Sequence, residues 1–192
     1  MDEPARTVPA FRLRRATEAD VAPLRALIAD SVRDLSRGFY TDAQAESALR
    51  HVFGPDTQLI ADGTYYVVDD ADGRLAAAGG WSRRRTLYGG DQMKGDALDP
   101  PLDPESEPAR IRAFFVHPSC ARRGLGRMLF AECLTAARAA GFRELALVAT
   151  LPGEPLYAAL GFTVRERFAV RLPDGLELPV AAMGRGIEGL RG

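Results

Sequence analysis

Hydrophobic and polar residues recur with the period of an α-helix in two segments of the first third of the chain. The first segment follows the capping sequence Thr17-Glu-Ala-Asp20, and the second follows Thr41-Asp-Ala-Gln44, which has the same pattern. A strand is predicted over Phe11–Arg15, and Gly54-Pro55 is expected to end the second helix. The apolar positions are Val21, Leu24, Leu27, Ile28, Val32 and Leu35 in the first helix and Ala45, Ala48, Leu49, Val52 and Phe53 in the second.

Two strand-like runs follow, over Tyr65–Asp69 and Leu75–Ser82, and Asp72-Gly73 between them predicts a hairpin turn. The pattern then changes to glycine, proline and acidic residues as far as Arg110. We expect a long loop here. Long loops of compact domains are commonly functional, so residues 83–109 are a candidate substrate loop.

The second half of the chain begins with an apolar strand that ends at Val116, followed by a helix from Leu125 to Ala140 and a strand over Leu145–Ala149. This order predicts a right-handed crossover between two parallel strands. A short helix within 152–161 and two strands, over 162–172 and 176–184, come next. We therefore predict a single α/β domain over residues 1–192.

The turn before the long helix, Arg122-Arg-Gly-Leu-Gly-Arg127, is rich in glycine and arginine. The first N–H groups of a helix have no partner within it, and the helix dipole adds positive charge there. Gly124 and Gly126 allow close approach, and the arginines suit phosphate oxygens, so the turn predicts a phosphate site. Simple packing is the alternative. A P-loop lysine is absent and Leu129 takes the third glycine position of a dinucleotide motif, which disfavours nucleoside triphosphates and nicotinamide cofactors.

Composition narrows the class of protein further. The 192 residues are 46% hydrophobic and 27% charged with a net charge of -1, so the chain can bury a core and has no excess of basic residues for nucleic acid. No apolar run has the length of a membrane span and no secretory signal is recognisable, so we expect a cytoplasmic protein without a membrane partner. Cys120 and Cys133 are expected to be reduced thiols, and no metal site is predicted.

Tyr157 follows the second parallel strand as the glycine turn follows the first. Both belong to the same end of the sheet, where open α/β proteins bind ligands. The sequence leaves open whether Tyr157 contacts a cofactor or only packs on its short helix. We interpret Trp81 as a core aromatic residue rather than a pocket wall, and His117 as a local hydrogen-bonding group rather than a base. Arg83–Arg85 is either surface or a local anion site.

The sequence Phe114-Phe-Val-His-Pro-Ser-Cys-Ala-Arg-Arg-Gly-Leu-Gly126, followed by Leu156-Tyr-Ala-Ala-Leu-Gly-Phe162, resembles the cofactor core of the GNAT superfamily of acyl-CoA N-acyltransferases. The resemblance covers about 109–164. It implies a GNAT-like α/β fold (an α+β mixed sheet), in which a central, mostly antiparallel sheet contains a parallel pair of splayed central strands and is flanked by helices. It also implies acetyl-CoA as cosubstrate.

The resemblance implies roles for particular residues. Backbone groups of one strand would pair with the pantetheine amides, N–H groups of the glycine turn would bind the diphosphate, and Tyr157 would be the general acid. The strand residues are Phe114, Phe115 and Val116, and the turn residues are Arg122, Arg123, Gly124, Leu125, Gly126 and Arg127.

The sequence departs from the family pattern in two ways. Ala121 replaces a glutamine or arginine at the start of the glycine motif, which removes one side-chain contact. Arg110 and Arg112 lie on the strand where many relatives carry a carboxylate as general base. Asp91, Glu154 or water are the remaining candidates for the base.

The leading functional hypothesis is an N-acetyltransferase that moves the acetyl group of acetyl-CoA to a primary amine of a small molecule or peptide by direct attack on the thioester. The alternative is a non-catalytic acyl-CoA-binding sensor or regulatory module, which the missing strand carboxylate favours. A homodimer formed through the terminal strands is an open alternative to a monomer, and the sequence has no motif that identifies the acceptor.

Overall fold

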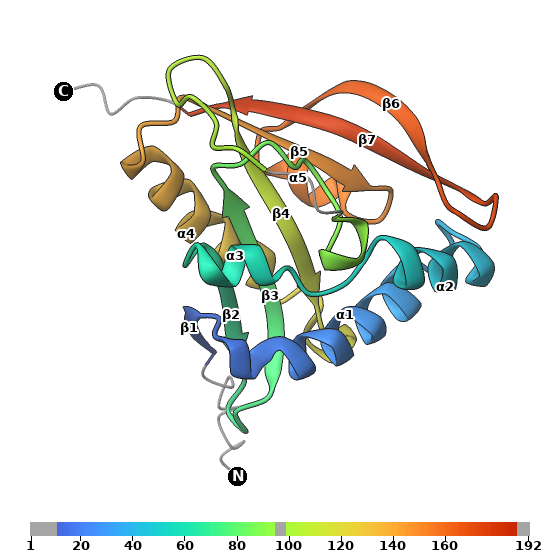
Figure 1. Ribbon diagram of the computed structural model, residues 1–192. Coiled ribbons are helices and arrows are strands. Elements are labelled where there is room, and N and C mark those ends of the chain that lie inside the picture. The colour runs from blue at the N-terminus through green and yellow to red at the C-terminus, as the bar shows by residue number, and fades with distance from the viewer. Residues whose placement is uncertain (1–10, 95–98, 188–192) are drawn as a thin grey trace, which may run out of the picture.

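The computed structural model describes residues 11–94 and 99–187, whose strands form a seven-stranded sheet in the order β1-β2-β3-β4-β5-β7-β6 (Figure 1). The strands are β1 Arg12–Arg15, β2 Tyr65–Asp69, β3 Leu75–Ser82, β4 Ala109–Val116, β5 Glu144–Thr150, β6 Thr163–Arg171 and β7 Glu177–Gly186. The helices are α1 Val21–Leu35, α2 Asp42–His51, α3 Thr57–Ala61, α4 Leu125–Ala139 and α5 Glu154–Ala159. These bounds confirm the predicted elements with small shifts at their ends.

Both predicted capping sequences begin helical segments. Asp20 Oδ2 accepts from the Thr17 backbone N–H at 2.7 Å, at the start of a 3-10 turn that leads into α1. At α2, Thr41 Oγ1 accepts from the Gln44 N–H at 3.2 Å, and Gln44 Oε1 accepts from the Thr41 N–H at 2.9 Å. Local side-chain chemistry therefore sets where these two helices start.

Helix α3 was not predicted from the sequence. It has five residues, which is too short for a helical period to appear in the hydrophobic pattern. Its N-cap is Asp56, whose Oδ1 accepts from the Leu59 N–H at 3.2 Å. Leu59, in the middle of α3, is buried in the core. The helix lies between α2 and β2 in the chain.

The predicted long loop between β3 and β4 contains more structure than its composition indicates. It includes a 3-10 turn over Asp91–Met93 and a bridge between Arg84 and Pro101, and Leu102 is buried in the core. Positions 95–98 of the candidate substrate loop lie outside the described residues. The rest of the loop is held against β3, β4 and α3.

Strands β4 and β5 form the parallel pair that the strand–helix–strand pattern predicts. Their pairing is short, with Ala109 opposite Leu145 and Arg110 opposite Ala146. Beyond these positions the two strands part. The other edge of β5 pairs with β7 along the whole length of β5, from Glu144 to Thr150. Neighbouring strands other than β4 and β5 are antiparallel, which confirms a mixed sheet with a splayed parallel pair.

A β-bulge lies in β4 just after the pairing with β5 ends. Ala78 pairs with Phe115 and Gly80 with Arg112, so Ala113 and Phe114 together face the single residue Gly79. Ala113 has a positive φ of 56°, and a Cβ at Gly79 would lie 2.7 Å from the Phe114 ring. The bulge turns the backbone of β4 at the point where its edge becomes free.

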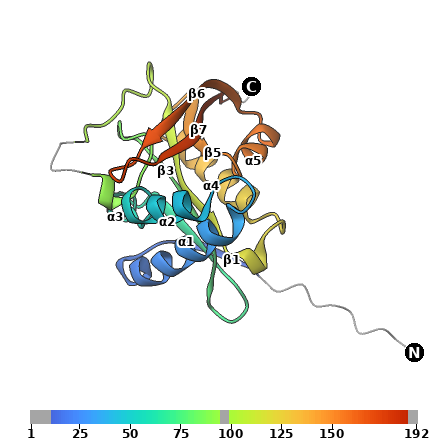
Figure 2. The ribbon, with the colours of Figure 1, turned by 90° about the vertical axis from the view of Figure 1, so that its right-hand side faces the viewer.

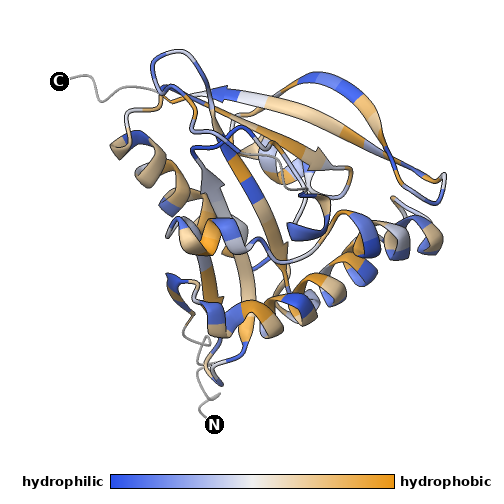
Figure 3. Ribbon diagram, viewed as in Figure 1, coloured by the Kyte–Doolittle hydropathy of each residue, from blue (hydrophilic) through white to orange (hydrophobic). Residues whose placement is uncertain are grey.

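Two hydrophobic layers cover opposite faces of the sheet. Tyr66 and Val68 of β2 pack in the core that contains Leu129 and Cys133 of α4, whereas the alternate residues Tyr65 and Val67 pack with helices α1 and α3. In Figure 3, hydrophobic and hydrophilic residues alternate along α1, as expected of a helix with one apolar face against a sheet. On β4, Ile111 packs in the core under α4. The next residue, Arg112, therefore lies on the face opposite α4.

The β6–β7 hairpin extends from the sheet toward α2 (Figures 1 and 2). Tyr40, just before α2, donates its hydroxyl to the Pro179 carbonyl at 2.6 Å, and Ser47 of α2 donates to Asp174 in the hairpin turn at 2.5 Å. No helix in the described residues is both long and apolar enough to cross a membrane.

Candidate active site

The glycine turn forms the start of α4. Gly124 is the N-cap with a left-handed φ of 84°, and no atom lies within 4 Å of the position that a Cβ would take there. Met128 donates to the Gly124 carbonyl at 3.0 Å, so the N–H groups of the three residues between them precede the first intrahelical bond. Arg122 also has a positive φ, of 63°. The turn offers free N–H donors around an open position, an arrangement that suits phosphate oxygens.

Gly126 has a second role in the structure. A Cβ at this position would lie 2.7 Å from Cδ2 of Leu156 in α5, so the missing side chain lets α4 and α5 approach closely. The packing alternative considered for the turn therefore applies to Gly126. It does not apply to Gly124, where the space is open.

The arginines of the turn are exposed. Within residues 11–94 and 99–187, Arg122, Arg123 and Arg127 form no ion pair with a carboxylate. Arg123 lies over the Phe11 ring, with its guanidinium carbon 4.8 Å from the ring centroid. Their charges remain available to an anion beside the N-terminus of α4.

The free edge of β4 lies beside this turn. Phe114, Phe115 and Val116 are half-buried and follow the last residue of β4 that pairs with β5. The Val116 N–H donates to Ser31 Oγ of α1 at 3.3 Å. Because β5 has moved away, this edge of β4 faces a gap between two parallel strands, although the Val116 N–H is bonded to α1 and contributes no donor to the gap.

Tyr157 of α5 lies at the same end of the sheet. Its ring packs against Phe114, with centroids 6.1 Å apart, and against Phe162, with centroids 5.9 Å apart. Burial raises the pKa of the Tyr157 hydroxyl above its ordinary value, so the phenol keeps its proton at neutral pH. The residue that the sequence left undecided is therefore both packed on its short helix and in contact with the free part of β4.

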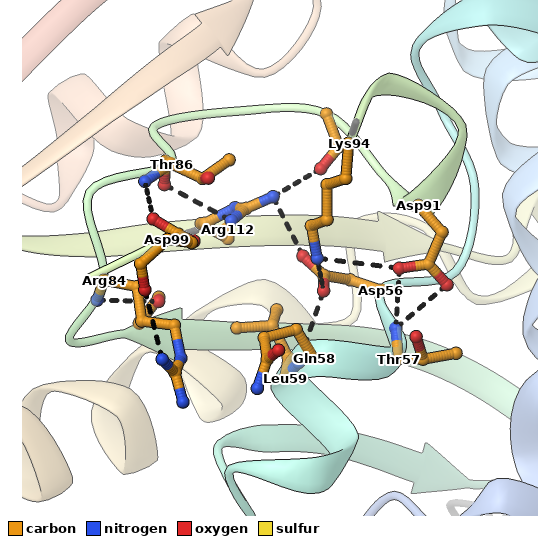
Figure 4. Close-up of polar contacts among 12 residues, drawn as sticks. Asp56, Thr57, Gln58, Leu59, Arg84, Thr86, Asp91, Lys94, Asp99 and Arg112 are labelled. Carbon is orange, nitrogen blue, oxygen red and sulfur yellow. Dashed lines mark hydrogen bonds and ion pairs between the residues drawn. The ribbon is translucent and has the colours of Figure 1, made fainter. Parts of the chain in front are cut away.

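A cluster of charged side chains lies on the other side of β4, opposite α4 (Figure 4). We call it the Asp56 cluster; its members are Asp56, Asp91, Lys94 and Arg112. Asp56 is fully buried, and its Oδ2 lies 2.8 Å from Arg112 Nη2, while Lys94 Nζ contacts its Oδ1. Arg112 also donates to the carbonyls of Thr86, at 3.2 Å, and Gly89. The cluster joins α3, the loop and β4.

Burial lowers the pKa of the Arg112 guanidinium, and the charge of Asp56 opposes that shift. Asp91 accepts from the Thr57 N–H at 3.1 Å and lies 3.5 Å from Lys94 Nζ. Two carboxylates thus face two cations. The balance of charge explains how a fully buried aspartate is tolerated.

The structure separates the two candidate bases. Asp91 lies in the Asp56 cluster, on the face of β4 opposite α4. Glu154 accepts from Arg167 at 2.9 Å and 2.6 Å, and this contact lowers the pKa of Glu154. Asp56 was not predicted from the sequence. An aspartate after Gly-Pro and before the apolar pair Leu59 and Ile60 is an N-cap signal that could have located it.

The remaining candidates have structural roles. Trp81 is buried and its ring packs on Phe142, with centroids 6.0 Å apart, so it is a core residue. His117 is the N-cap of a 3-10 turn and its Nδ1 bonds Ser119 Oγ at 2.8 Å. Arg84 forms an ion pair with Asp62 at 2.7 Å. Cys120 and Cys133 are free and buried thiols.

A parted pair of parallel strands and a helix start that suits phosphate oxygens, both at one end of the sheet, are features of α/β proteins that bind ligands there. The sequence profile of the acetyltransferase (GNAT) family matches residues 29–162. The chain belongs to this family, whose members transfer an acetyl group and use acetyl-CoA as cosubstrate. A search of curated proteins finds no match.

Solved structures share the fold over nearly the whole chain. A GCN5-related N-acetyltransferase from Rhodopseudomonas palustris has a TM-score of 0.65 at 18% identity, with 94% of this chain and 96% of that chain covered. PaiA N-acetyltransferase from Thermoplasma acidophilum, solved with coenzyme A, has a TM-score of 0.61 at 13% identity, with 92% and 99% covered. A phosphinothricin acetyltransferase from Sinorhizobium meliloti, solved with acetyl-CoA, has a TM-score of 0.59 at 20% identity, with 92% and 88% covered.

Proposed function

We propose that this protein is an N-acetyltransferase that moves the acetyl group of acetyl-CoA to a primary amine of a small molecule or peptide. The observation that carries the proposal is the parting of β4 and β5 after Arg110 and Ala146, beside the open helix start at Gly124. The structural neighbours solved with coenzyme A and acetyl-CoA support this use of the fold. The cytoplasm remains our predicted location, and a homodimer remains a prediction.

The cosubstrate would be held mainly by backbone groups. We assign the pantetheine amides to the free edge of β4 and the diphosphate to the start of α4. The residues are Phe114, Phe115 and Val116 on the strand, and Arg122, Arg123, Gly124, Leu125, Gly126 and Arg127 at the turn. Because these ligands are N–H and C=O groups, the replacement of the usual side chain by Ala121 removes one contact and leaves the others.

The reaction requires a neutral amine. A lysine-like amine is neutral in about one molecule in a few thousand at pH 7, a cost of about 4–5 kcal/mol unless the site assists deprotonation. Asp91 is the better candidate for that assistance, because it lies in the Asp56 cluster beside β4, whereas both carboxylate oxygens of Glu154 accept from Arg167. Solvent water is the alternative base.

Attack by the amine on the thioester carbonyl gives an oxyanion, which a preorganised N–H group of β4 would stabilise. Coenzyme A then leaves as a thiolate with a pKa near ~8.5. Complete proton transfer from Tyr157 would be uphill by more than about 2 kcal/mol, because burial raises the pKa of this phenol further above that of the thiol. We therefore assign Tyr157 a strong hydrogen bond to the leaving sulfur.

The test combines calorimetry with acetyl-CoA and a turnover assay on a panel of primary amines, in which the free thiol of coenzyme A is followed. The protein's own Cys120 and Cys133 are buried, so native protein contributes little thiol signal. Binding with turnover on at least one amine is expected. Binding without turnover on any amine would favour the acyl-CoA sensor, and no binding at millimolar acetyl-CoA would contradict both functions.

A further inference from the structure

The chain has 25 lysines and arginines in total, and Lys94 is the only lysine among them. The difference matters in an acetyltransferase. The guanidinium of arginine stays protonated at any physiological pH and is a poor nucleophile, whereas the ε-amine of lysine becomes nucleophilic once it loses one proton. The chain therefore carries a single side-chain amine that its own reaction could modify.

That amine is held in the Asp56 cluster (Figure 4). Lys94 Nζ contacts the fully buried Asp56 and lies 3.5 Å from Asp91 Oδ1. The side chain of Lys94 is 21% exposed, so it is neither sealed in the core nor free in solvent. Two carboxylates fix its ammonium group on the side of the sheet where α3 and the loop lie.

The cluster is next to the cofactor strand. Asp56 Oδ2 lies 2.8 Å from Arg112, which directly precedes Ala113 at the bulge of β4. On the face of the sheet covered by α1 and α3, the Tyr65 hydroxyl donates to the Ala113 carbonyl at 3.4 Å. Arg112 and the neighbouring Ile111 point to opposite faces, and Ile111 is packed in the core under α4. Lys94 is therefore held on the face of β4 opposite α4, next to the free part of the strand.

We propose that Lys94 is acetylated by acetyl-CoA bound to the same chain, an inference that rests on the proposed function. The ammonium of Lys94 gives one proton to a neighbouring carboxylate or to water, and its nitrogen lone pair attacks the thioester carbonyl. The new C–N bond forms first, the nitrogen gives up its second proton, and the C–S bond then breaks as coenzyme A leaves with the sulfur electron pair and takes up that proton. The products are Nζ-acetyl-lysine and free coenzyme A.

Acetylation changes the balance of charge in the Asp56 cluster. Before the reaction, Asp56 and Asp91 face Lys94 and Arg112; afterwards only Arg112 remains as a cation. The amide of acetyl-lysine can donate one hydrogen bond but carries no charge. The contact that ties the loop to α3 is weakened, so the modification acts on the segment that borders the acceptor side.

The experiment measures the mass of the intact full-length chain with acetyl-CoA alone, without any added amine, and maps the modified residue by peptide analysis. The site control is Lys94→Arg, which removes the amine. The matched control is Arg74→Lys, in the exposed β2–β3 turn, which adds a second lysine far from the cluster. In that variant both lysines are exposed to the same acetyl-CoA concentration in one sample, so their acetylation rates can be compared directly.

We expect Lys94 to gain one acetyl group about tenfold or more faster than the new side chain at position 74, because it is held beside the thioester site. The rate constant at saturating acetyl-CoA should not depend on protein concentration, and excess coenzyme A should suppress it. Equal rates at the two positions, a rate no higher than in the urea-unfolded chain, or a second-order dependence on protein would each overturn the inference. Turnover on the amine panel without Lys94 acetylation would overturn it while leaving the proposed function intact.

Discussion

Asp56 and Arg112 form a buried ion pair that joins the start of α3 to the cofactor strand β4, with Asp56 Oδ2 2.8 Å from Arg112 Nη2 and 2% of the Arg112 side chain exposed. The sequence presents Arg112 as a replacement for a catalytic carboxylate. In the structure its guanidinium is held by Asp56 and by two loop carbonyls, so it positions the loop against β4.

Asp56→Asn should destabilise the protein by about 3–5 kcal/mol in urea unfolding, because the charge of Arg112 is then buried without its partner. Asparagine is also a good N-cap, so the change leaves the cap of α3 intact. The double variant with Arg112→Met should be less destabilised than the sum of the two single changes. The control is Glu46→Gln at the exposed ion pair with Arg33, where a much smaller change is expected. Equal effects at Asp56 and Glu46 would contradict the assignment.

Gly124→Ala should weaken acetyl-CoA binding by about tenfold in calorimetry, because a Cβ would enter the open position in front of the free N–H groups. It should also cost about 1 kcal/mol of stability, since the left-handed φ is unfavourable for alanine. Gly175→Ala is the matched control: Gly175 has a φ of 86° and equally open surroundings, but lies in the β6–β7 turn. Both variants should lose stability, and only the first should lose affinity.

Tyr157→Phe should lower turnover by about a hundredfold while changing acetyl-CoA affinity much less. The variant keeps the ring that packs on Phe114 and Phe162 and removes only the hydroxyl. Free-thiol kinetics and calorimetry separate the two effects. Tyr66→Phe, at a buried tyrosine of β2 outside the proposed site, is the control. Unchanged turnover in the Tyr157 variant would remove this phenol from the mechanism.

The stability of the N-terminal part should depend on pH through Asp20. Hydrogen bonds from Arg14 lower the pKa of Asp20 from 3.8 to about 2. The folded state therefore gains stability above the unfolded pKa near ~3.8, and this gain is lost as pH falls toward 2. Allowing for screening around the partly exposed Arg14, Asp20→Asn should cost about 1–2 kcal/mol at pH 7. Urea unfolding should show the difference from the natural chain shrinking as pH falls from about 4 to about 2; a constant difference would contradict the assignment.

Elements set by local chemistry could be predicted from the sequence. The capping sequences at Thr17 and Thr41, the stop at Gly141 and the turn at Asp72-Gly73 act within a few residues, so their signals are visible in the chain itself. The glycine turn before α4 belongs to the same group. These signals fixed the order of most helices and strands and the end of the sheet where the candidate site lies.

Features set by long-range pairing could not be predicted. The sequence of a hairpin does not show which of its two strands pairs with β5. In the structure β7 pairs with β5, and β6 lies at the edge of the sheet. Asp56 lies in a segment too short for a helical pattern, and its partners Lys94 and Arg112 are distant in the chain. Charge pairs of this kind depend on tertiary packing, which leaves no periodic pattern in the sequence.

The position of β7 between β5 and β6 has a consequence for synthesis on the ribosome. Strand β5 shares only two residue pairs with β4, so most of its backbone bonds must wait for β7, the last strand of the sheet to be translated. Until β7 emerges, β5 is held by its two pairs with β4 and by packing in the core under α4. A nascent chain that already includes α4 and α5 therefore carries the residues assigned to coenzyme A before the β5 side of the gap is complete.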